Sequence, residues 1–266
     1  MTQAVEQKMM VTEQQMNHFR TFGFVIFRQL FTPAELATYK EEFDRGLNLW
    51  IEGGVHTGEK RHYALFTHGE TPFICSLHDD PRFADAAEQL LNKPVLGVTV
   101  NGNYYVGDTQ WHPDNGTQLY EGVKFAIYLE PRDAKTGALR VIPGSHRDPL
   151  YSAMKKDPQA AFGVRPDEVP CFPFESQPGD VLAFNLATWH SAFGGDDHRR
   201  MGVVLYYEDP QTPEVEAMMV EHIKRAINTA RNYGQPGWFT PYWKSIDNPR
   251  HQRWVRRLTE MGVIDV

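Results

Sequence analysis

The residues best suited to chemistry in this sequence are His112 and Asp114, which stand two positions apart in the segment Trp111-His112-Pro113-Asp114. On an extended strand, side chains two residues apart leave the same face, so the imidazole and the carboxylate would point the same way. His190, further along the chain, would complete a face of two histidines and one carboxylate. Such a face binds Fe(II) and leaves the opposite coordination positions open, as in non-haem iron oxygenases. The sequence therefore predicts a metal site made of these three residues.

The His-x-Asp pair alone is weak evidence, because a surface turn at Pro113 would explain it equally well. Its position strengthens the prediction: the pair follows a strand-like run, and His190 follows another, residues 181–186. A tryptophan precedes each histidine, as Trp111 and as Trp189. In a barrel with a metal at one mouth, ligands are expected at strand ends of this kind.

An arginine would be needed if the metal binds a 2-oxo acid. The keto oxygen and the nearest carboxylate of such a co-substrate can chelate Fe(II), and the far carboxylate then requires a buried cation, for which arginine is best suited. Arg199 and Arg200 open a third strand-like run after His190. Neighbouring residues alternate across a strand, so only one of the two can face inward. Thr109, near the metal pair, is either a co-substrate contact or a strand-end residue.

The elements that must position these residues follow an α+β order that is mainly β. Capping-box signals at Thr12 and Thr32, with Pro33 at the first helical position, predict helices in the part from 12 to 92. Short runs rich in β-branched and aromatic residues then predict an antiparallel barrel over about 94–208, with strands at 95–106, 123–129, 139–142, 181–186 and 199–208. A helical and aromatic extension follows at 210–266. The prediction is one domain, 1–266: a double-stranded β-helix, or jelly roll, of cupin-like type with N- and C-terminal helices outside.

Two segments are candidate covers for the site, the irregular stretch 53–79 and the aromatic segment Trp238–Trp243. The histidines of the first could touch an anionic substrate, although hydrogen-bonded loop histidines are the commoner case. His146 is expected in a turn, and His198 and His222 at the surface. Three tyrosines on the predicted strands could line a pocket, face outward or lie in the core: Tyr104, Tyr105 and Tyr128.

Composition limits the function classes. The net charge of −7 and the scattered basic residues give no sign of a nucleic-acid surface. Cys75 and Cys171 have no metal-binding or redox spacing, the first residues lack the apolar run of a signal peptide, and no stretch is long enough to span a membrane. We therefore expect a soluble, cytoplasmic protein that acts on a small molecule as a monomer or a homodimer.

Four segments together resemble the phytanoyl-CoA dioxygenase-like (PhyH) family of Fe(II)/2-oxoglutarate-dependent dioxygenases. The resemblance covers about residues 13–208, and its segments are 19–30 with the following helix, 107–114, 137–146 and 189–199. By position it implies that His112, Asp114 and His190 bind iron, with 2-oxoglutarate and dioxygen as co-substrates, and that Arg199 holds the 2-oxoglutarate carboxylate. The sequence departs from many members in having Ala192 where a serine helps to hold the co-substrate. The spacing from His190 to Arg199 is also slightly short, which keeps Arg200 as a rival.

The resemblance implies oxidative decarboxylation of 2-oxoglutarate to succinate and CO2, which generates an oxidant for a C–H bond of the substrate. Related halogenases have glycine or alanine in place of the carboxylate, so Asp114 indicates a hydroxylase and not a halogenase. Desaturation, epoxidation and ring closure remain open, as does the substrate. The absence of a basic cluster for CoA phosphates favours a small metabolite, such as one of secondary metabolism. Two alternatives are a non-catalytic cupin-type protein that binds a metal or ligand, and a metal-dependent lyase or isomerase.

Overall fold

The computed structural model describes residues 11–51, 53–156, 163–195 and 198–264. The predicted helix starts are confirmed: Thr12 and Thr32 each form a capping box at the start of α1 (Glu13–Phe22) and α2 (Pro33–Asn48). Gly23, with φ of 82°, ends α1 in the left-handed conformation that glycine adopts without strain, and β1 (Phe24–Phe27) follows directly.

The other helices of the described residues lie between strands or after the last strand. They are α3 (Pro72–Ser76), α4 (Pro81–Leu91), α5 (Leu150–Lys156), the 3-10 turn Pro166–Glu168, α6 (Pro213–Arg231), α7 (Pro241–Lys244) and α8 (Pro249–Glu260). Helix α5 lies between β-strand segments of the barrel, and residues 157–162 after it lie outside the described part. Among the described residues, no helix combines the length and apolar character needed to cross a membrane.

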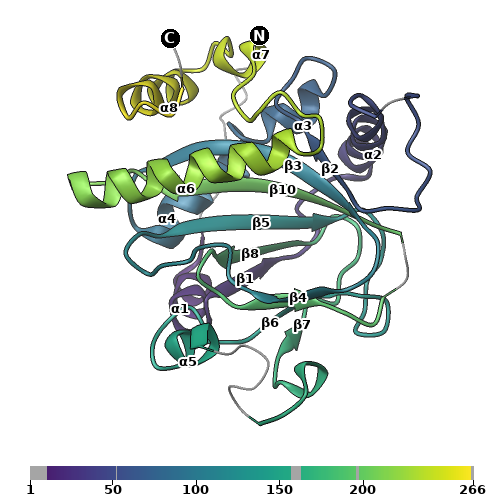
Figure 1. Ribbon diagram of the computed structural model, residues 1–266, viewed down its shortest axis with the longest axis vertical. Coiled ribbons are helices and arrows are strands. Elements are labelled where there is room, and N and C mark those ends of the chain that lie inside the picture. Colours follow the sequence, from purple (N-terminus) through teal and green to yellow (C-terminus); the bar gives the residue numbers. More distant parts are fainter. Residues whose placement is uncertain (1–10, 52, 157–162, 196–197, 265–266) are drawn as a thin grey trace.

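Two antiparallel sheets form the jelly roll (Figure 1), which confirms the predicted fold class. The larger sheet has the order β1-β8-β5-β10-β3-β2, with β8 (Val181–Asn185), β5 (Gly122–Tyr128), β10 (Arg199–Glu208), β3 (Val95–Tyr105) and β2 (His62–Leu65). The smaller sheet has the order β4-β9-β6-β7, with β4 (Thr109–His112), β9 (His190–Ala192), β6 (Leu139–Val141) and β7 (Phe172–Pro173). The five predicted strands are all present, whereas β4, β7 and β9 were not predicted as separate strands.

The outer face of the larger sheet is packed by helices. Helix α2 lies close to the sheet at Gly202 and Gly102, which pair across β10 and β3. A Cβ at Gly202 would collide with the hydroxyl of Tyr39, and a Cβ at Gly102 would collide with Phe43. Tyr206 on the same face contacts Trp254 of α8, with ring centroids 5.9 Å apart. The two glycines therefore allow the helical layer to lie directly on the strands, which leaves the opposite face of this sheet to form the site.

Parts of the two predicted covers, 53–79 and Trp238–Trp243, belong to this core. Trp243 is fully buried and donates an indole hydrogen bond of 3.1 Å to Nδ1 of His78. Strand β2, within the segment 53–79, pairs with β3. Aromatic side chains this deeply buried are structural, because exposing them would remove a large apolar area from the core.

Candidate active site

The three predicted metal ligands converge at one end of the smaller sheet. His112 ends β4 and His190 begins β9, and the two residues pair directly across the strands, with ring centroids 4.3 Å apart. Asp114 follows β4 and places a carboxylate oxygen 3.8 Å from Nε2 of His190. One ligand atom from each residue lies within 4.8 Å of the other two. Two imidazoles and one carboxylate at this spacing fit a divalent transition metal bound on one face.

Backbone carbonyls orient both imidazoles. Nδ1 of His112 lies 2.7 Å from the carbonyl of Gln110, and Nδ1 of His190 lies 2.9 Å from the carbonyl of Thr188. A carbonyl can only accept, so each Nδ1 carries the proton and each Nε2 keeps a free lone pair. Burial, reinforced by the neighbouring His112, lowers the pKa of His190 to about 3. His190 is therefore neutral at physiological pH, which is the form that binds a metal.

Lys124 of β5 provides the nearest cation to the carboxylate ligand. Its Nζ donates to Oδ2 of Asp114 at 2.8 Å, and both side chains are mostly buried. Burial alone would raise the pKa of Asp114, but the positive charge of Lys124 and its hydrogen bond lower that pKa well below its usual range. The carboxylate is therefore ionised and ready to bind a metal. Nothing in the sequence marked Lys124, because a single lysine in a strand is usually exposed.

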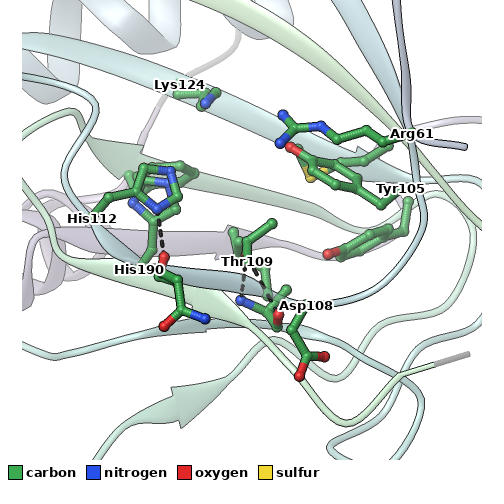
Figure 2. A pocket seen from close by; sticks show the side chains of 13 residues that line it. Arg61, Tyr105, Asp108, Thr109, His112, Lys124 and His190 are labelled. Carbon is green, nitrogen blue, oxygen red and sulfur yellow. Dashed lines mark hydrogen bonds between the residues drawn. The ribbon is translucent and has the colours of Figure 1, made fainter. Parts of the chain in front are cut away.

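A cavity of about 310 Å³ opens beside the histidines, between the two sheets (Figure 2). Figure 2 shows Arg61 and Lys124 on one side of it and Thr109 and Asp108 on the other. The complete lining is Arg61, Tyr105, Asp108, Thr109, Gln110, His112, Lys124, Tyr128, Leu139, Phe184, His190, Ala192 and Met201. Tyr105 and Tyr128 thus face this cavity, whereas Tyr104 turns away and bonds His198.

The two candidate arginines lie on opposite faces of β10. Arg199 is fully buried, and its Nη2 donates to the carbonyl of Gly107. Its Nε and Nη1 have no hydrogen-bond partner among the described residues. The guanidinium lies 5.7 Å from the ring centroid of Tyr105, a lining residue, although Arg199 itself does not line the cavity. A buried guanidinium with unsatisfied donors fits a carboxylate ligand.

Arg200 points to the outer face, where carboxylates already satisfy it. Its Nη1 lies 2.6 Å from Asp44 and its Nη2 lies 2.5 Å from Glu130. The alternation expected for this strand therefore places Arg199 inside and Arg200 outside, and only Arg199 is positioned to serve a ligand.

Thr109 joins the strands that carry the histidines. Its hydroxyl accepts a 2.8 Å hydrogen bond from the amide of Ala192, and Ser191 donates to its carbonyl at 2.6 Å. These bonds tie β4 to β9 where the register shifts between Thr109 and His112. Thr109 also lines the cavity, so both of its predicted roles are compatible with its position.

Two residues of the site carry no signal in the sequence, and a third lies elsewhere than predicted. Arg61 and Lys124, which the sequence does not single out, line the cavity. His222 of α6 is half-buried and meets the ring of Tyr207 edge-on, with ring centroids 5.7 Å apart, so it is less exposed than expected. Hydrophobic periodicity could have placed His222 on the inner face of α6, but the sequence does not reveal what that face covers.

The chain is similar to known proteins that belong to one enzyme family. A sequence model described as phytanoyl-CoA dioxygenase (PhyH) matches residues 19–201. The ectoine dioxygenase of Bordetella bronchiseptica is 25% identical over 150 residues, which are 50% of this chain and 49% of that protein. The chain thus spans about half the length of the curated relatives it matches.

Solved structures share the fold. AviO1 from Streptomyces viridochromogenes superposes with a TM-score of 0.58 at 18% identity, over 79% of this chain and 98% of that one. HygX from Streptomyces hygroscopicus, which was solved with nickel and 2-oxoglutarate bound, gives a TM-score of 0.59 at 19% identity, over 75% and 87% of the two chains. With the family match covering most of the jelly roll and the three ligands in place, the chain belongs to the phytanoyl-CoA dioxygenase (PhyH) family of iron- and 2-oxoglutarate-dependent oxygenases.

Proposed function

We propose that this protein hydroxylates a small-molecule metabolite, using Fe(II), 2-oxoglutarate and dioxygen and releasing succinate and CO2. The observation that carries the proposal is a metal face beside a cavity together with a buried arginine that lies against Tyr105, a residue lining that cavity. The metal face of His112, Asp114 and His190 lies open to a cavity, and Arg199 lies buried nearby with two unsatisfied donors. Together they match the two ends of a 2-oxo dicarboxylate.

Each residue has a role that follows from its contacts. The two imidazoles offer Nε2 because their Nδ1 atoms bond backbone carbonyls. Asp114 would offer one carboxylate oxygen to the metal, and a carboxylate ligand there would argue for oxygen transfer and against chloride transfer. Arg199 binds the far carboxylate of 2-oxoglutarate, and Thr109 lies beside the bound acid. When bound, Fe(II) and 2-oxoglutarate supply an oxidant able to remove hydrogen from a C–H bond.

The size of the site supports a small substrate. The cavity beside the histidines measures about 310 Å³, and a second one beside it measures about 280 Å³. Pockets for small ligands usually measure several hundred Å³. Cavities of this volume fit a small metabolite better than a substrate attached to a large acyl carrier. We therefore favour a role in the biosynthesis of small metabolites.

The test is an anaerobic titration of metal-free protein with Fe(II) and then 2-oxoglutarate, followed by the weak visible absorption of an iron-chelated 2-oxo acid. We expect the band in wild-type protein, its loss in His112→Ala, and at least tenfold weaker 2-oxoglutarate binding in Arg199→Gln. Arg200→Gln is the matched control and should bind as wild type does, because Arg200 faces Asp44 and Glu130. A wild-type protein that binds iron but gives no band and forms no succinate would contradict the proposal.

A further inference from the structure

The cavity beside the metal ligands continues into a second one. Four residues line both: Arg61, Tyr105, His112 and Lys124. The second cavity extends towards α6 and has a partly apolar lining, formed by Leu186, Leu205, Tyr207, Ala226, Ala230 and Trp238. The metal face is therefore reached from two sides, and 2-oxoglutarate, in the proposed pose towards Arg199, would leave the side nearer α6 free.

Two cations stand where the cavities meet. The guanidinium of Arg61 lies 4.6 Å from the ring centroid of Tyr105, and its Nη2 donates to Asn103 at 3.0 Å. The structure records no carboxylate partner for Arg61 within the described ranges. Lys124 bonds Asp114, whose carboxylate is also a metal ligand. A metal ion on Asp114 would repel the ammonium group and weaken the one carboxylate contact that Lys124 makes within the described residues.

The charges around the site do not cancel. Arg61, Lys124 and Arg199 are positive, and the carboxylates that line the two cavities are Asp108 and Asp114. Fe(II) and doubly ionised 2-oxoglutarate neutralise each other. One positive charge is then left without a carboxylate partner among the residues that line the two cavities, and an anionic group of a bound substrate would neutralise it.

We propose that Arg61 and Lys124 form a subsite for an anionic group of the substrate, and that the substrate is a small carboxylic acid. The inference rests on the function proposed above and adds the substrate class. The carboxylate bridges the guanidinium and the ammonium group at the junction of the cavities. The carbon skeleton lies along the apolar lining below α6, with its reacting C–H bond towards the open side of the metal face.

Matched pairs of acids and amides test this subsite. The probes are hexanoate against hexanamide, phenylacetate against phenylacetamide, and cyclohexanecarboxylate against cyclohexanecarboxamide, which have nearly the same shape and differ in charge. Binding to the anaerobic Fe(II) and 2-oxoglutarate complex is measured by calorimetry. We expect at least one acid to bind at least tenfold more tightly than its amide, because charge-assisted hydrogen bonds are stronger than neutral ones.

Variants of Arg61 assign the preference to the subsite. Arg61→Gln should remove most of the acid preference and leave the 2-oxoglutarate absorption and affinity unchanged, and Arg61→Lys should restore part of it. Arg256→Gln, at an exposed position on α8, makes the same change in net charge and should keep the wild-type preference. An unchanged acid preference in Arg256→Gln would show that the loss in Arg61→Gln comes from the contact of Arg61 with the acid and not from the change in net charge.

Three results would overturn the subsite: equal binding of acids and amides, no binding of any acid, or weaker 2-oxoglutarate binding in Arg61→Gln with the acid preference intact. The last result would mean that Arg61 holds the co-substrate. Failure of the proposed function has a different signature, because the visible band would be missing from wild-type protein even where the acid preference is present.

Discussion

At the scale of single residues, the site depends on how its charges are compensated before a metal binds. Lys124 lies 2.8 Å from Asp114, and both histidines have their Nδ1 atoms bound to backbone carbonyls. The carboxylate is thereby kept ionised and the imidazoles are kept in the metal-binding tautomer. The same lysine competes with the metal for the carboxylate, because two cations repel each other across a distance of a few ångströms.

Lys124→Met should therefore bind divalent metal more tightly at neutral pH, by about threefold to tenfold, since the competing charge is removed. Calorimetric titration of metal-free protein with Mn(II) or Co(II) measures the change. Lys135→Met, in the exposed turn after Asp133, removes the same charge away from the site and should leave the metal affinity unchanged. Weaker metal binding in Lys124→Met would show that the lysine organises the ligands instead of competing for one.

At the scale of elements, two loops that lie against each other both approach the guanidinium of Arg199. Gly137 lies between β5 and β6, and Gly195 lies between β9 and β10. A Cβ added at either glycine would collide with Nη1 of Arg199. Both loops therefore come close enough to restrict the guanidinium, which helps to explain how a fully buried arginine keeps one orientation with no carboxylate partner among the described residues.

Gly195→Ala should displace Arg199 without removing its charge. The new Cβ would lie 2.6 Å from the Cα of Gly137, so backbone as well as side chain must move. We expect about tenfold weaker 2-oxoglutarate binding at unchanged metal affinity, measured by the visible titration and by calorimetry. Gly116→Ala is the control, because its Cβ would meet nothing within 4 Å. Wild-type 2-oxoglutarate affinity in Gly195→Ala would count against Arg199 as the anchor.

At the scale of the whole molecule, the C-terminal segment is part of the folded core. His78 accepts a hydrogen bond from Trp243, and His251 lies 2.9 Å from Asp79. Burial, with His251 nearby, lowers the pKa of His78 to about 3. A polar network between helices α7 and α8 and the rest of the chain thus contains a neutral, fully buried histidine.

The stability of metal-free protein should fall on acidification. His78 takes up a proton in the unfolded chain below pH 6.5 but resists protonation in the folded state until about pH 3. Its contribution is complete above pH 6.5 and is lost towards pH 3, at up to about 1.4 kcal/mol per pH unit. The free energy of unfolding, measured with urea at pH 7.5 and at pH 5.5, should differ less between the two pH values in His78→Gln than in wild type. Equal differences would mean that His78 is not buried in its neutral form.

The parts of this structure that the sequence reveals are those with local or repeated signals. Capping boxes at Thr12 and Thr32 mark helix starts through hydrogen bonds within one turn, and β-branched runs mark the long strands. The metal ligands were predictable because His-x-Asp and His190 both stand beside such runs. Strand β9 has only three residues, too few for a pattern.

The inward cations depend on long-range pairing and could not be predicted. Lys124 faces the site because β5 pairs with β10 and β8 in a particular register, and Arg61 does so because β2 adds to the edge of β3. Which of Arg199 and Arg200 faces inward also depends on how β10 pairs with its neighbours, so the sequence alone could not decide it. Moving a strand by one residue exchanges its two faces, and only the folded sheet fixes which face is inside.

The division of the site between the two sheets has a consequence for which oxo acids the protein accepts. His112 and His190 belong to the smaller sheet and Arg199 to the larger one, so an acid held at both ends bridges the two layers. The distance between the two sheets then determines which length of oxo acid can reach both the histidines and the arginine. Oxaloacetate, one carbon shorter, and 2-oxoadipate, one carbon longer, should bind less tightly than 2-oxoglutarate in the visible titration, and equal affinities would show that the acid is held at one end only.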